Sequence, residues 1–290
     1  KYNPKYFAPK LGALIRESIK CGRLPSSFYK GDISVLYKKD ERDDPRNYRP
    51  ITLLQNAYKV FTRIQAQRLK KVVHEFVSEC QKGFVPHAFI AECSMLINLI
   101  EAYMNDEEHP KRGGLMLFLD MEKAFDRVSY EFLMSAAEAV GFGPNFLRTL
   151  RMMYSTDRPP KRRIYANGFY SNWFDIKSGV AQGCPLSPLL FLLVAEALKI
   201  ALYQEPEYKG ITIGERQIKT NQFADDSTLF LAGPSDMPHA ERGLKKWCSA
   251  SGMRENYKKR EGLAMGKYSR GRRRRTLPAG TAWVKKGEWA

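Results

Sequence analysis

Apolar residues in the first part of the chain recur at helical spacing in several stretches. One stretch has its apolar residues at Leu11, Leu14, Ile15 and Ile19. This is the spacing of one helical face, and Gly22 follows directly, so we predict a helix that ends at this glycine. The elements predicted in this part are a helix over 11–21, a strand over 32–39, a turn over 40–47, a helix over 56–77, a helix over 91–103 and a loop over 105–114.

The helix predicted over 56–77 is long, amphipathic and basic. Its apolar face is expected to carry Phe61, Ile64, Val72 and Phe76. Around the rest of the helix stand Arg63, Arg68, Lys70 and Lys71. Such a basic face suits the backbone of a nucleic acid, and a solvated helix face is the alternative interpretation.

The second half of the chain combines a buried run, hairpin signals and further helices. Residues 115–120, LMLFLD, form a short apolar run that predicts a buried strand with Asp120 at its tip. The pair Asn167 and Gly168 stands between alternating residues and predicts a hairpin turn. The other predicted elements are helices over 129–141, 188–203 and 239–251 and hairpins over 211–220 and 221–232. Helices and strands mix without a steady alternation, which favours an α+β architecture.

The composition of the chain indicates that it can bury a core and that it has a charged partner. With 290 residues, of which 43% are apolar, the chain can bury a sizeable core, which excludes an intrinsically disordered protein. The formal net charge is +17, from 48 Lys and Arg against 31 Asp and Glu. This excess points to a polyanionic partner, with nucleic acid as the leading candidate, and a basic protein that merely stays soluble is the alternative.

The cysteines and the longest apolar run indicate the cellular environment of the protein. The five cysteines are Cys21, Cys80, Cys93, Cys184 and Cys248. They form no C-x-x-C pair, and only four histidines could complete a zinc site, so we expect a reduced, intracellular protein. The run over 188–198 is too short to span a bilayer, and no membrane partner is expected. The chain starts within a helical region and stops without a closing element, so we expect a fragment of a longer polypeptide.

Three aspartates carry the candidate chemistry. Asp225 and Asp226 stand side by side within an otherwise apolar run, where burial would be costly without a cation. An aspartate that caps the backbone of its own turn is the alternative. If the strand that ends at Asp120 lies beside this hairpin, the three carboxylates converge, and hard oxygen ligands suit Mg²⁺. Two ions about 3.5–4 Å apart would clamp the attacking and leaving oxygens of a phosphoryl displacement.

Several segments together resemble one enzyme family. The segments 118–128 (FLDMEKAFDRV), 178–188 (SGVAQGCPLSP), 223–226 (FADD) and 252–262 (GMRENYKKREG) resemble motifs A, B, C and D of reverse transcriptases. Upstream, 47–69 and 81–85 (QKGFV) resemble finger motifs of non-LTR, LINE-type retrotransposon reverse transcriptases, with group II intron enzymes as more distant kin. The resemblance covers about residues 10–266.

The resemblance implies a right-hand polymerase fold of fingers and palm, with a ferredoxin-like antiparallel palm sheet. The expected domains are fingers over 1–114, palm with motif A over 115–128, a connection with a hairpin over 129–177, palm with motifs B, C and D over 178–266, and a basic tail over 267–290 with the thumb absent. The arginine-rich part of this tail, 270–275, could bind nucleic acid or direct nuclear import, or could be a disordered charge run.

The resemblance also implies a catalytic and metal-binding set. Asp120, Asp225 and Asp226 match the carboxylates of the family, and the backbone carbonyl of Met121 matches an additional metal ligand. The implied cofactor is Mg²⁺, as two ions, with Mn²⁺ as an alternative. Lys259 matches the lysine that protonates the departing pyrophosphate, and the adjacent Lys258 is a competitor for this role.

A further set is implied to bind the incoming nucleotide. Phe125 matches the aromatic residue that excludes ribonucleotides by contact with the sugar 2′ carbon, although ordinary core packing is the alternative. Asp126 beside it is expected to be structural. Gln182 and Gly183 lie in the loop that holds the incoming nucleotide and the template base. Lys39, or Lys38 instead, and Arg49 match triphosphate contacts.

The sequence therefore predicts an RNA-directed DNA polymerase core. Its expected partners are an RNA template, a DNA primer and dNTP, together with the thumb and endonuclease of a larger polyprotein, and a nuclear location is expected of the family. One alternative is an RNA-dependent RNA polymerase, which the aromatic residue Phe125 disfavours. The other is a catalytically incomplete fragment that acts only as an RNA-binding module.

Overall fold

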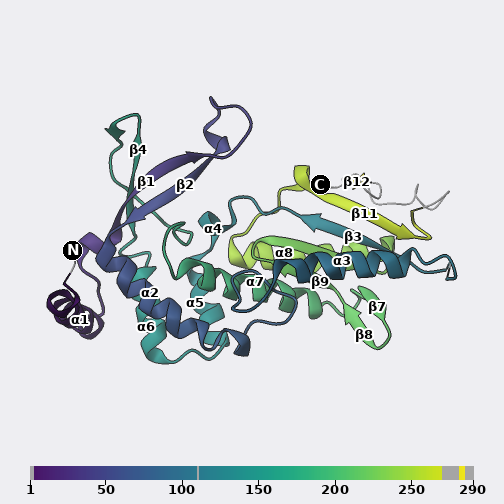
Figure 1. Cartoon of the computed structure of the whole chain (residues 1–290), viewed down its shortest axis with the longest axis horizontal. Coiled ribbons are helices and arrows are strands. Elements are labelled where there is room, and N and C mark those ends of the chain that lie inside the picture. Colours follow the sequence, from purple (N-terminus) through teal and green to yellow (C-terminus); the bar gives the residue numbers. More distant parts are fainter. Residues whose placement is uncertain (1–2, 110, 270–280, 285–290) are drawn as a thin grey trace. The chain divides into compact units, whose positions relative to one another are not determined.

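The chain folds into two compact units (Figure 1). The structure is a computed structural model that describes residues 3–109, 111–269 and 281–284. Unit 1 comprises residues 1–72 and 128–190, and unit 2 comprises residues 73–127 and 191–290. The arginine-rich run over 270–275, for which the sequence left nucleic-acid binding, nuclear import and a disordered charge run open, lies outside the described residues. The division into fingers and palm stays a prediction.

The first segment of unit 1, residues 1–72, contains two α-helices. Helix α1 spans Pro4–Cys21 and ends at Gly22, whose φ of 65° is the left-handed conformation that glycine adopts most readily, as predicted. Helix α2 spans Asn56–Lys70, and a short 3₁₀ helix at Val73–Glu75 follows in place of the predicted continuation to residue 77.

The buried face of α2 differs from the predicted one. Ile64 and Val72 were expected on the apolar face, but they are 40% and 41% exposed. The buried stripe instead contains Tyr58, Phe61, Thr62, Gln65, Ala66 and Leu69. Two polar residues, Thr62 and Gln65, belong to this buried face. The positions of the apolar residues alone therefore predicted the wrong face of the helix as the buried one.

A five-stranded sheet forms the other part of unit 1. Its strands are β1 (Lys30–Tyr37), β2 (Tyr48–Leu54), β4 (Lys161–Ala166), β5 (Phe169–Tyr170) and β6 (Phe174–Asp175). The order is β2-β1-β4-β5, with β6 also paired to β4, and β1 lies antiparallel to β2 and parallel to β4. Asn167 and Gly168, with φ of 50° and 86°, form the predicted turn between β4 and β5. The strand β2 was not predicted. It contains Pro50, which an edge strand tolerates.

Two more helices complete unit 1. Helix α5 spans Tyr130–Ala139, and the hydroxyl of its N-cap Ser129 accepts a hydrogen bond from the backbone of Phe132, close to the predicted start. Helix α6 spans Pro144–Met153 and was not predicted. Its signals were present, since Gly143 precedes a proline at the first helical position.

Unit 2 is built on a second five-stranded sheet. Its strands are β3 (Gly113–Leu119), β9 (Thr220–Phe223), β10 (Asp226–Leu231), β11 (Glu261–Gly266) and β12 (Ala282–Val284), in the order β12-β11-β3-β10-β9. All pairs are antiparallel except β11 with β12. A separate hairpin joins β7 (Ile211–Ile213) to β8 (Arg216–Ile218), as predicted. The observed architecture is therefore α+β, which confirms the predicted class.

Helices cover the sheet of unit 2. Helix α3 spans Ile90–Met104, and its residues Ile100 and Met104 join a buried cluster with strand residues such as Met116 and Phe230. Helix α7 spans Ser187–Tyr203 and helix α8 spans Met237–Ser251, and Trp247 Nε1 donates to the carbonyl of Val194 at 2.8 Å. The short helix α4 is Ala124–Arg127. Among the described helices, none is long and apolar enough to cross a membrane.

Candidate active site

The predicted carboxylates lie on neighbouring strands of unit 2. Strand β10 pairs with β3 up to Ser227 opposite Leu119, so Asp226 and Asp120 occupy the next position of this register. Asp225 is the second residue of the two-residue turn that joins β9 to β10. The structure thus places the backbone positions of Asp120, Asp225 and Asp226 at one end of the same strand pair, so the two strands are neighbours as expected. The joint role of the three carboxylates in metal binding stays a prediction.

These carboxylates are more exposed than the surrounding apolar run suggests. Asp120 and Asp225 are half-buried, Asp226 is exposed, and the buried part of β10 begins at Ser227. The expectation of two adjacent buried carboxylates is therefore wrong, because the turn places them at the end of the strand pair, where solvent reaches them. The exposure of these carboxylates means that no cation is needed to offset their burial. The argument for a metal rests on their placement at one end of the strand pair and on their being oxygen ligands.

Asp120 is contacted by two side chains of the segment that resembles motif D. Asn256 Nδ2 donates to Oδ2 of Asp120 at 3.1 Å. Lys259 Nζ lies 3.7 Å from the same oxygen, and its side chain is 52% exposed. The predicted lysine therefore lies at the carboxylate end of the strand pair, and Asn256 is a contact that the sequence reasoning missed.

The chain after β3 pairs with the same segment around Met121. Asn256 N donates to the carbonyl of Asp120 at 2.8 Å, and Glu122 N donates to the carbonyl of Arg254 at 2.8 Å. Neither hydrogen bond uses the carbonyl of Met121. The pairing is therefore compatible with the ligand role that the resemblance implies for this oxygen.

The donor set fits Mg²⁺ in its chemistry, because carboxylate and carbonyl oxygens are the ligands that this ion prefers. The carboxylates are not tightly clustered. Among the described residues, the only group of three potential ligands whose atoms lie within 4.8 Å of one another is Asp106, Glu108 and His109. That group lies in a surface loop where Asp106 already accepts hydrogen bonds from Arg112 and Glu108.

A buried arginine holds the segment that carries Asn256 and Lys259. Arg260 is 4% exposed, and its guanidinium donates to both carboxylate oxygens of Glu255 at 2.6 and 2.7 Å and to Glu241 at 2.7 Å. Burial alone would lower the pKa of Arg260, but the hydrogen bonds to the two glutamates outweigh it and raise the pKa. Bidentate pairing fixes direction as well as distance, so the loop over 255–260 has a defined shape.

Phe125 lies between two other aromatic rings of unit 2. Its ring stacks on Phe191 with centroids 4.9 Å apart and planes at 12°, and it forms an edge-to-face pair with Phe84 with centroids 6.1 Å apart. The residue is half-buried, so part of the ring stays accessible. This arrangement accommodates both interpretations of the sequence, because the stack packs one face of the ring and leaves part of it for a ligand.

The residues predicted to bind nucleotide in unit 1 gather around the β1–β2 hairpin. Arg49 is exposed and pairs with Leu36, and Lys39 is exposed in the loop just beyond the last strand pair. The carbonyl of Gln182 accepts a hydrogen bond from Thr52 N at 2.7 Å, which ties the motif B loop to β2.

Gly183 contributes to the same junction. A Cβ added at Gly183, where φ is 111°, would lie 2.5 Å from the carbonyl oxygen of Thr52. The close approach that requires glycine here is to β2 itself, whereas the sequence suggested a ligand.

Gln81 is a second residue that the sequence reasoning missed. It is 1% exposed, and its side-chain amide bonds both backbone polar groups of Ala224, the residue before Asp225. The signal was present, since QKGFV was identified as a motif, but nothing local connects it to a turn 143 residues away.

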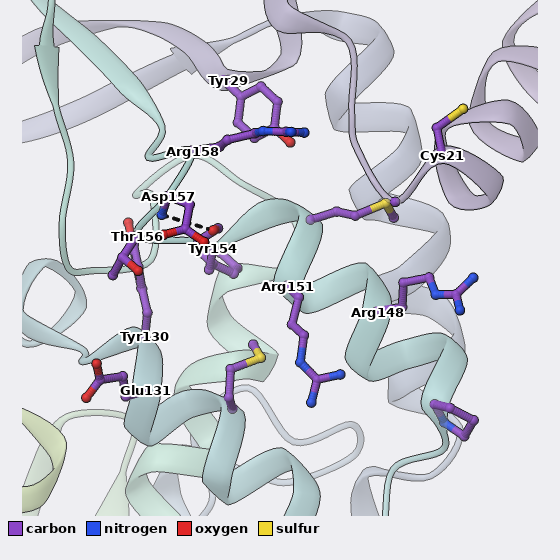
Figure 2. A pocket seen from close by; sticks show the side chains of 15 residues that line it. Cys21, Tyr29, Tyr130, Glu131, Arg148, Arg151, Tyr154, Thr156, Asp157 and Arg158 are labelled. Carbon is purple, nitrogen blue, oxygen red and sulfur yellow. Dashed lines mark hydrogen bonds between the residues drawn. The ribbon is translucent and has the colours of Figure 1, made fainter.

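Unit 1 also contains a cavity of about 720 Å³ that none of the predicted site residues lines. Figure 2 shows its side chains, with Arg148 and Arg151 on α6 and Arg158 beyond the end of that helix. Arg151 is paired with Glu138, whereas Arg148 and Arg158 have no ion-pair partner among the described residues. Glu131 and Asp157 line the cavity as well, so its lining carries charges of both signs.

Comparisons with known proteins place this chain in a family. The chain is 30% identical over 263 residues to the transposon TX1 uncharacterized 149 kDa protein of Xenopus laevis, which covers 89% of this chain and 19% of that protein. It is 29% identical to the Pol polyprotein of the type-1 retrotransposable element R2 of Popillia japonica, over 82% of this chain and 32% of that protein. The chain therefore spans about a fifth to a third of the length of these relatives.

Solved structures give the fold. Apo telomerase from Candida tropicalis, truncated from its C-terminal domain, matches with a TM-score of 0.55 at 12% identity, over 82% of this chain and 50% of that chain. Telomerase has the right-hand polymerase fold, so this likeness confirms the predicted fold class. Residues 36–277 match the family described as reverse transcriptase (RNA-dependent DNA polymerase). The chain belongs to the reverse transcriptase family, and the relatives named here are proteins of non-LTR retrotransposons.

Proposed function

We propose that this chain is the catalytic core of an RNA-directed DNA polymerase, which adds a dNMP to the 3′ hydroxyl of a DNA primer on an RNA template. The observation that carries the proposal is the placement of Asp120 at the tip of β3 beside Asp225 and Asp226 at the β9–β10 turn. Carboxylates that converge from neighbouring strand ends suit two-metal nucleotidyl transfer.

The metal ligands in this proposal are the carboxylates of Asp120, Asp225 and Asp226 and the carbonyl of Met121, which would hold two Mg²⁺, or Mn²⁺ in their place. Bound ions lower the pKa of the attacking hydroxyl and stabilise the charge that develops at the phosphate. Asn256 orients Asp120 through the hydrogen bond to Oδ2. The exposure of Asp226 is consistent with a less direct metal contact than that of its neighbour.

Lys259 would donate a proton to the pyrophosphate as it leaves. Its ammonium lies 3.7 Å from Asp120, so it is within reach of the carboxylate end of the strand pair. Protonation of a leaving oxygen is general acid catalysis, worth about 10²–10⁴-fold. Lys258 is the competing donor, and comparing the pH dependence of Lys259→Gln with that of Lys258→Gln decides between them.

The remaining predicted residues would bind the nucleotide. Phe125 would exclude a 2′ hydroxyl through the accessible part of its ring. Arg49 and Lys39 would contact the triphosphate, for which a guanidinium fork is well suited. Gln182 and Gly183 would hold the incoming nucleotide and the template base.

The proposed partners follow from the proposed reaction and from the relatives. They are an RNA template, a DNA primer and dNTP, and the rest of a larger polyprotein that contributes a thumb and an endonuclease. We propose a nuclear location as well, and a fluorescent fusion of the whole chain that stays out of the nucleus would contradict it.

Primer extension tests the proposed activity. The intact chain is given a DNA primer on an RNA template with Mg²⁺ and dNTP, alongside Asp225→Asn and the matched control Asp106→Asn, an isosteric change at a surface-loop carboxylate of the same unit. We expect extension by the intact chain and the control and a loss of at least about 10²-fold in Asp225→Asn, comparable to removal of an electrostatic group from a transition state. Equal extension by the three proteins would refute the assignment, and a preference for rNTP would favour an RNA polymerase.

One second function has an observation in its favour. The net charge of +17 and the arginine-lined cavity of unit 1 suit an RNA-binding module without turnover. In that case RNA affinity falls steeply with salt, Arg148→Glu weakens it, and no extension occurs even with Mn²⁺. Extension by the intact chain excludes this alternative.

A further inference from the structure

Residues 81–84, QKGF, lie along the outer edge of β9. Lys82 N donates to the carbonyl of Gln222 at 2.9 Å, and Gln222 N donates to the carbonyl of Cys80 at 2.7 Å. Strand β9 is the last strand of its sheet, so the segment covers this edge and continues it by a parallel pairing of Gln81 with Gln222. The segment therefore runs beside the turn that carries Asp225.

Gln81 fixes the conformation of this turn. Its Oε1 accepts hydrogen bonds from Gly83 N at 2.7 Å and Ala224 N at 2.9 Å, and its Nε2 donates to the carbonyl of Ala224 at 3.2 Å. Ala224 has a φ of 57°, a left-handed conformation that is strained for a residue with a Cβ. The amide of Gln81 satisfies both backbone groups of the strained residue and so opposes its relaxation.

Gly83 and Phe84 extend the contact in two directions. A Cβ on Gly83 would overlap the backbone nitrogen of Ala224 and lie 2.7 Å from its Cα, so the segment and the turn touch through their main chains. Phe84, with a φ of 59°, packs its ring against that of Phe125 in an edge-to-face arrangement with an interplanar angle of 87°. The same four residues thus contact the metal turn and the aromatic ring proposed to select the sugar.

We propose that Gln81, Gly83 and Phe84 form a positioning brace for both parts of the site. Gln81 and Gly83 hold the turn of Asp225 in the conformation that binds metal, and Phe84 holds Phe125 against Phe191. The brace touches neither metal nor substrate. It rests on the proposed function of Asp225 and Phe125, and it adds that metal affinity and sugar selectivity are set in part by one segment.

The metal arm is tested by Mn²⁺ binding to the whole chain, followed by the EPR signal of free Mn²⁺ without nucleic acid. We expect Gln81→Ala to raise the Kd for Mn²⁺ by about 5–10-fold, since about 1.4 kcal/mol corresponds to tenfold. Gln81→Ala/Ala224→Gly should recover at least half of this loss, because glycine adopts the same φ without strain. Lys82→Ala, whose side chain pairs with Glu92 at 2.7 Å, is the matched control from the same segment.

Two results would contradict the proposed effect of Gln81 on metal binding. Both can be distinguished from a failure of the proposed function. An unchanged Kd in Gln81→Ala, with Asp225→Asn weakened, shows that the turn does not need the brace. A loss in Gln81→Ala that Ala224→Gly does not reduce shows a general structural defect. If Gln81→Ala does not fold, Gln81→Glu replaces it, since it keeps the acceptor and removes the donor, and an unchanged Kd overturns the arm. Absence of Mn²⁺ binding by the intact chain refutes the metal site itself.

The sugar arm is tested by the ratio of kcat/KM for dNTP over rNTP. Phe84→Ala should lower this ratio by about 5–10-fold, mainly through faster use of rNTP, whereas Phe84→Tyr keeps the ring and the ratio. A merely structural role would lower activity with both nucleotides equally and leave the ratio unchanged, which would overturn this arm.

Discussion

Unit 1 and unit 2 hold their predicted site residues by different means. In unit 2, Asp120 and Asp225 lie next to buried or half-buried side chains that hydrogen-bond the surrounding backbone or carboxylate, with Gln81 as the most buried example. In unit 1, Arg49 and Lys39 are exposed on a hairpin. This difference suits the proposed roles, because ligands of a metal require a fixed backbone, whereas long side chains that contact phosphate can rely on their reach.

Two buried arginines give the sharpest form of this contrast. Arg260 in unit 2 is 4% exposed and pairs with two glutamates, and Arg162 in unit 1 is 6% exposed and donates to the carbonyls of Tyr29 and Lys161. Burial lowers the pKa of Arg162, and no carboxylate of the described residues lies within ion-pair distance of it. The buried arginine that is paired with carboxylates therefore lies in the loop with the candidate site residues Asn256 and Lys259. Within the described part of the chain, the buried arginine of the unit 1 sheet has only backbone carbonyls as acceptors.

The largest effect is expected from Arg260→Met. Removing one partner leaves Glu255, 3% exposed, as a buried unpaired charge, so the free energy of unfolding should fall by about 3–5 kcal/mol. Arg162→Met leaves only carbonyls unpaired and should cost about 1–3 kcal/mol. Urea denaturation of the two variants measures this difference, and a larger loss in Arg162→Met would reverse the comparison.

The next effect compares two glycines of unit 1. Gly168 has a φ of 86°, and a Cβ added there would meet only open space, so Gly168→Ala should cost only the backbone strain, about 1–3 kcal/mol. Gly183→Ala adds an overlap with Thr52 and should cost about 1–3 kcal/mol more. It should also raise the KM for dNTP, which Gly168→Ala should leave unchanged. If the two variants have equal stability and equal KM for dNTP, the contact between the motif B loop and β2 can adjust to the added Cβ without cost.

Phe125→Ala should have an effect on selectivity rather than on stability. Removal of the ring opens the space for a 2′ hydroxyl, so the preference for dNTP over rNTP should fall by tenfold or more, about 1.4 kcal/mol. Single-nucleotide incorporation kinetics measure the preference. If Phe125→Ala loses stability while the preference stays, the ring is a core residue, which is the other interpretation of its stack on Phe191.

The smallest effect is expected from the exposed residues of unit 1. Arg49→Ala should raise the KM for dNTP by about 3–10-fold with little change in kcat, since a contact that is equal in ground and transition states affects KM alone. Arg42→Ala is the matched control, because Arg42 lies in the loop of the same hairpin with its guanidinium over Tyr37. A fall in kcat without a change in KM would mean that Arg49 acts in the chemical step.

Local signals in the sequence predicted the elements that local physics decides. Gly22, the Asn167–Gly168 turn and the strand ending at Asp120 each depend on a few adjacent residues, and the structure confirms them. The rotation of α2 could not be predicted, because it depends on which partners cover Gln65 and Thr62.

Contacts between segments that are distant in the chain could not be predicted from the sequence. Gln81 reaches Ala224 across 143 residues, and Arg260 reaches Glu241 across 19. Each of these polar side chains would be assigned to the surface by its type alone, and only the buried partner explains its position. The candidate ligands were therefore predictable from motifs, and the residues that hold them were not.

The most direct test of the central claim is a change of metal preference at Asp225. Asp225→Cys replaces a hard oxygen ligand with a thiolate, which favours softer ions, and Asp225→Ser is the matched variant without a thiolate. In primer extension, we predict that both variants are inactive with Mg²⁺ and that Mn²⁺ restores the cysteine variant at least tenfold above the serine variant. Equal recovery of the two variants with Mn²⁺, or full activity of Asp225→Cys with Mg²⁺, would contradict the proposal that Asp225 binds the catalytic metal.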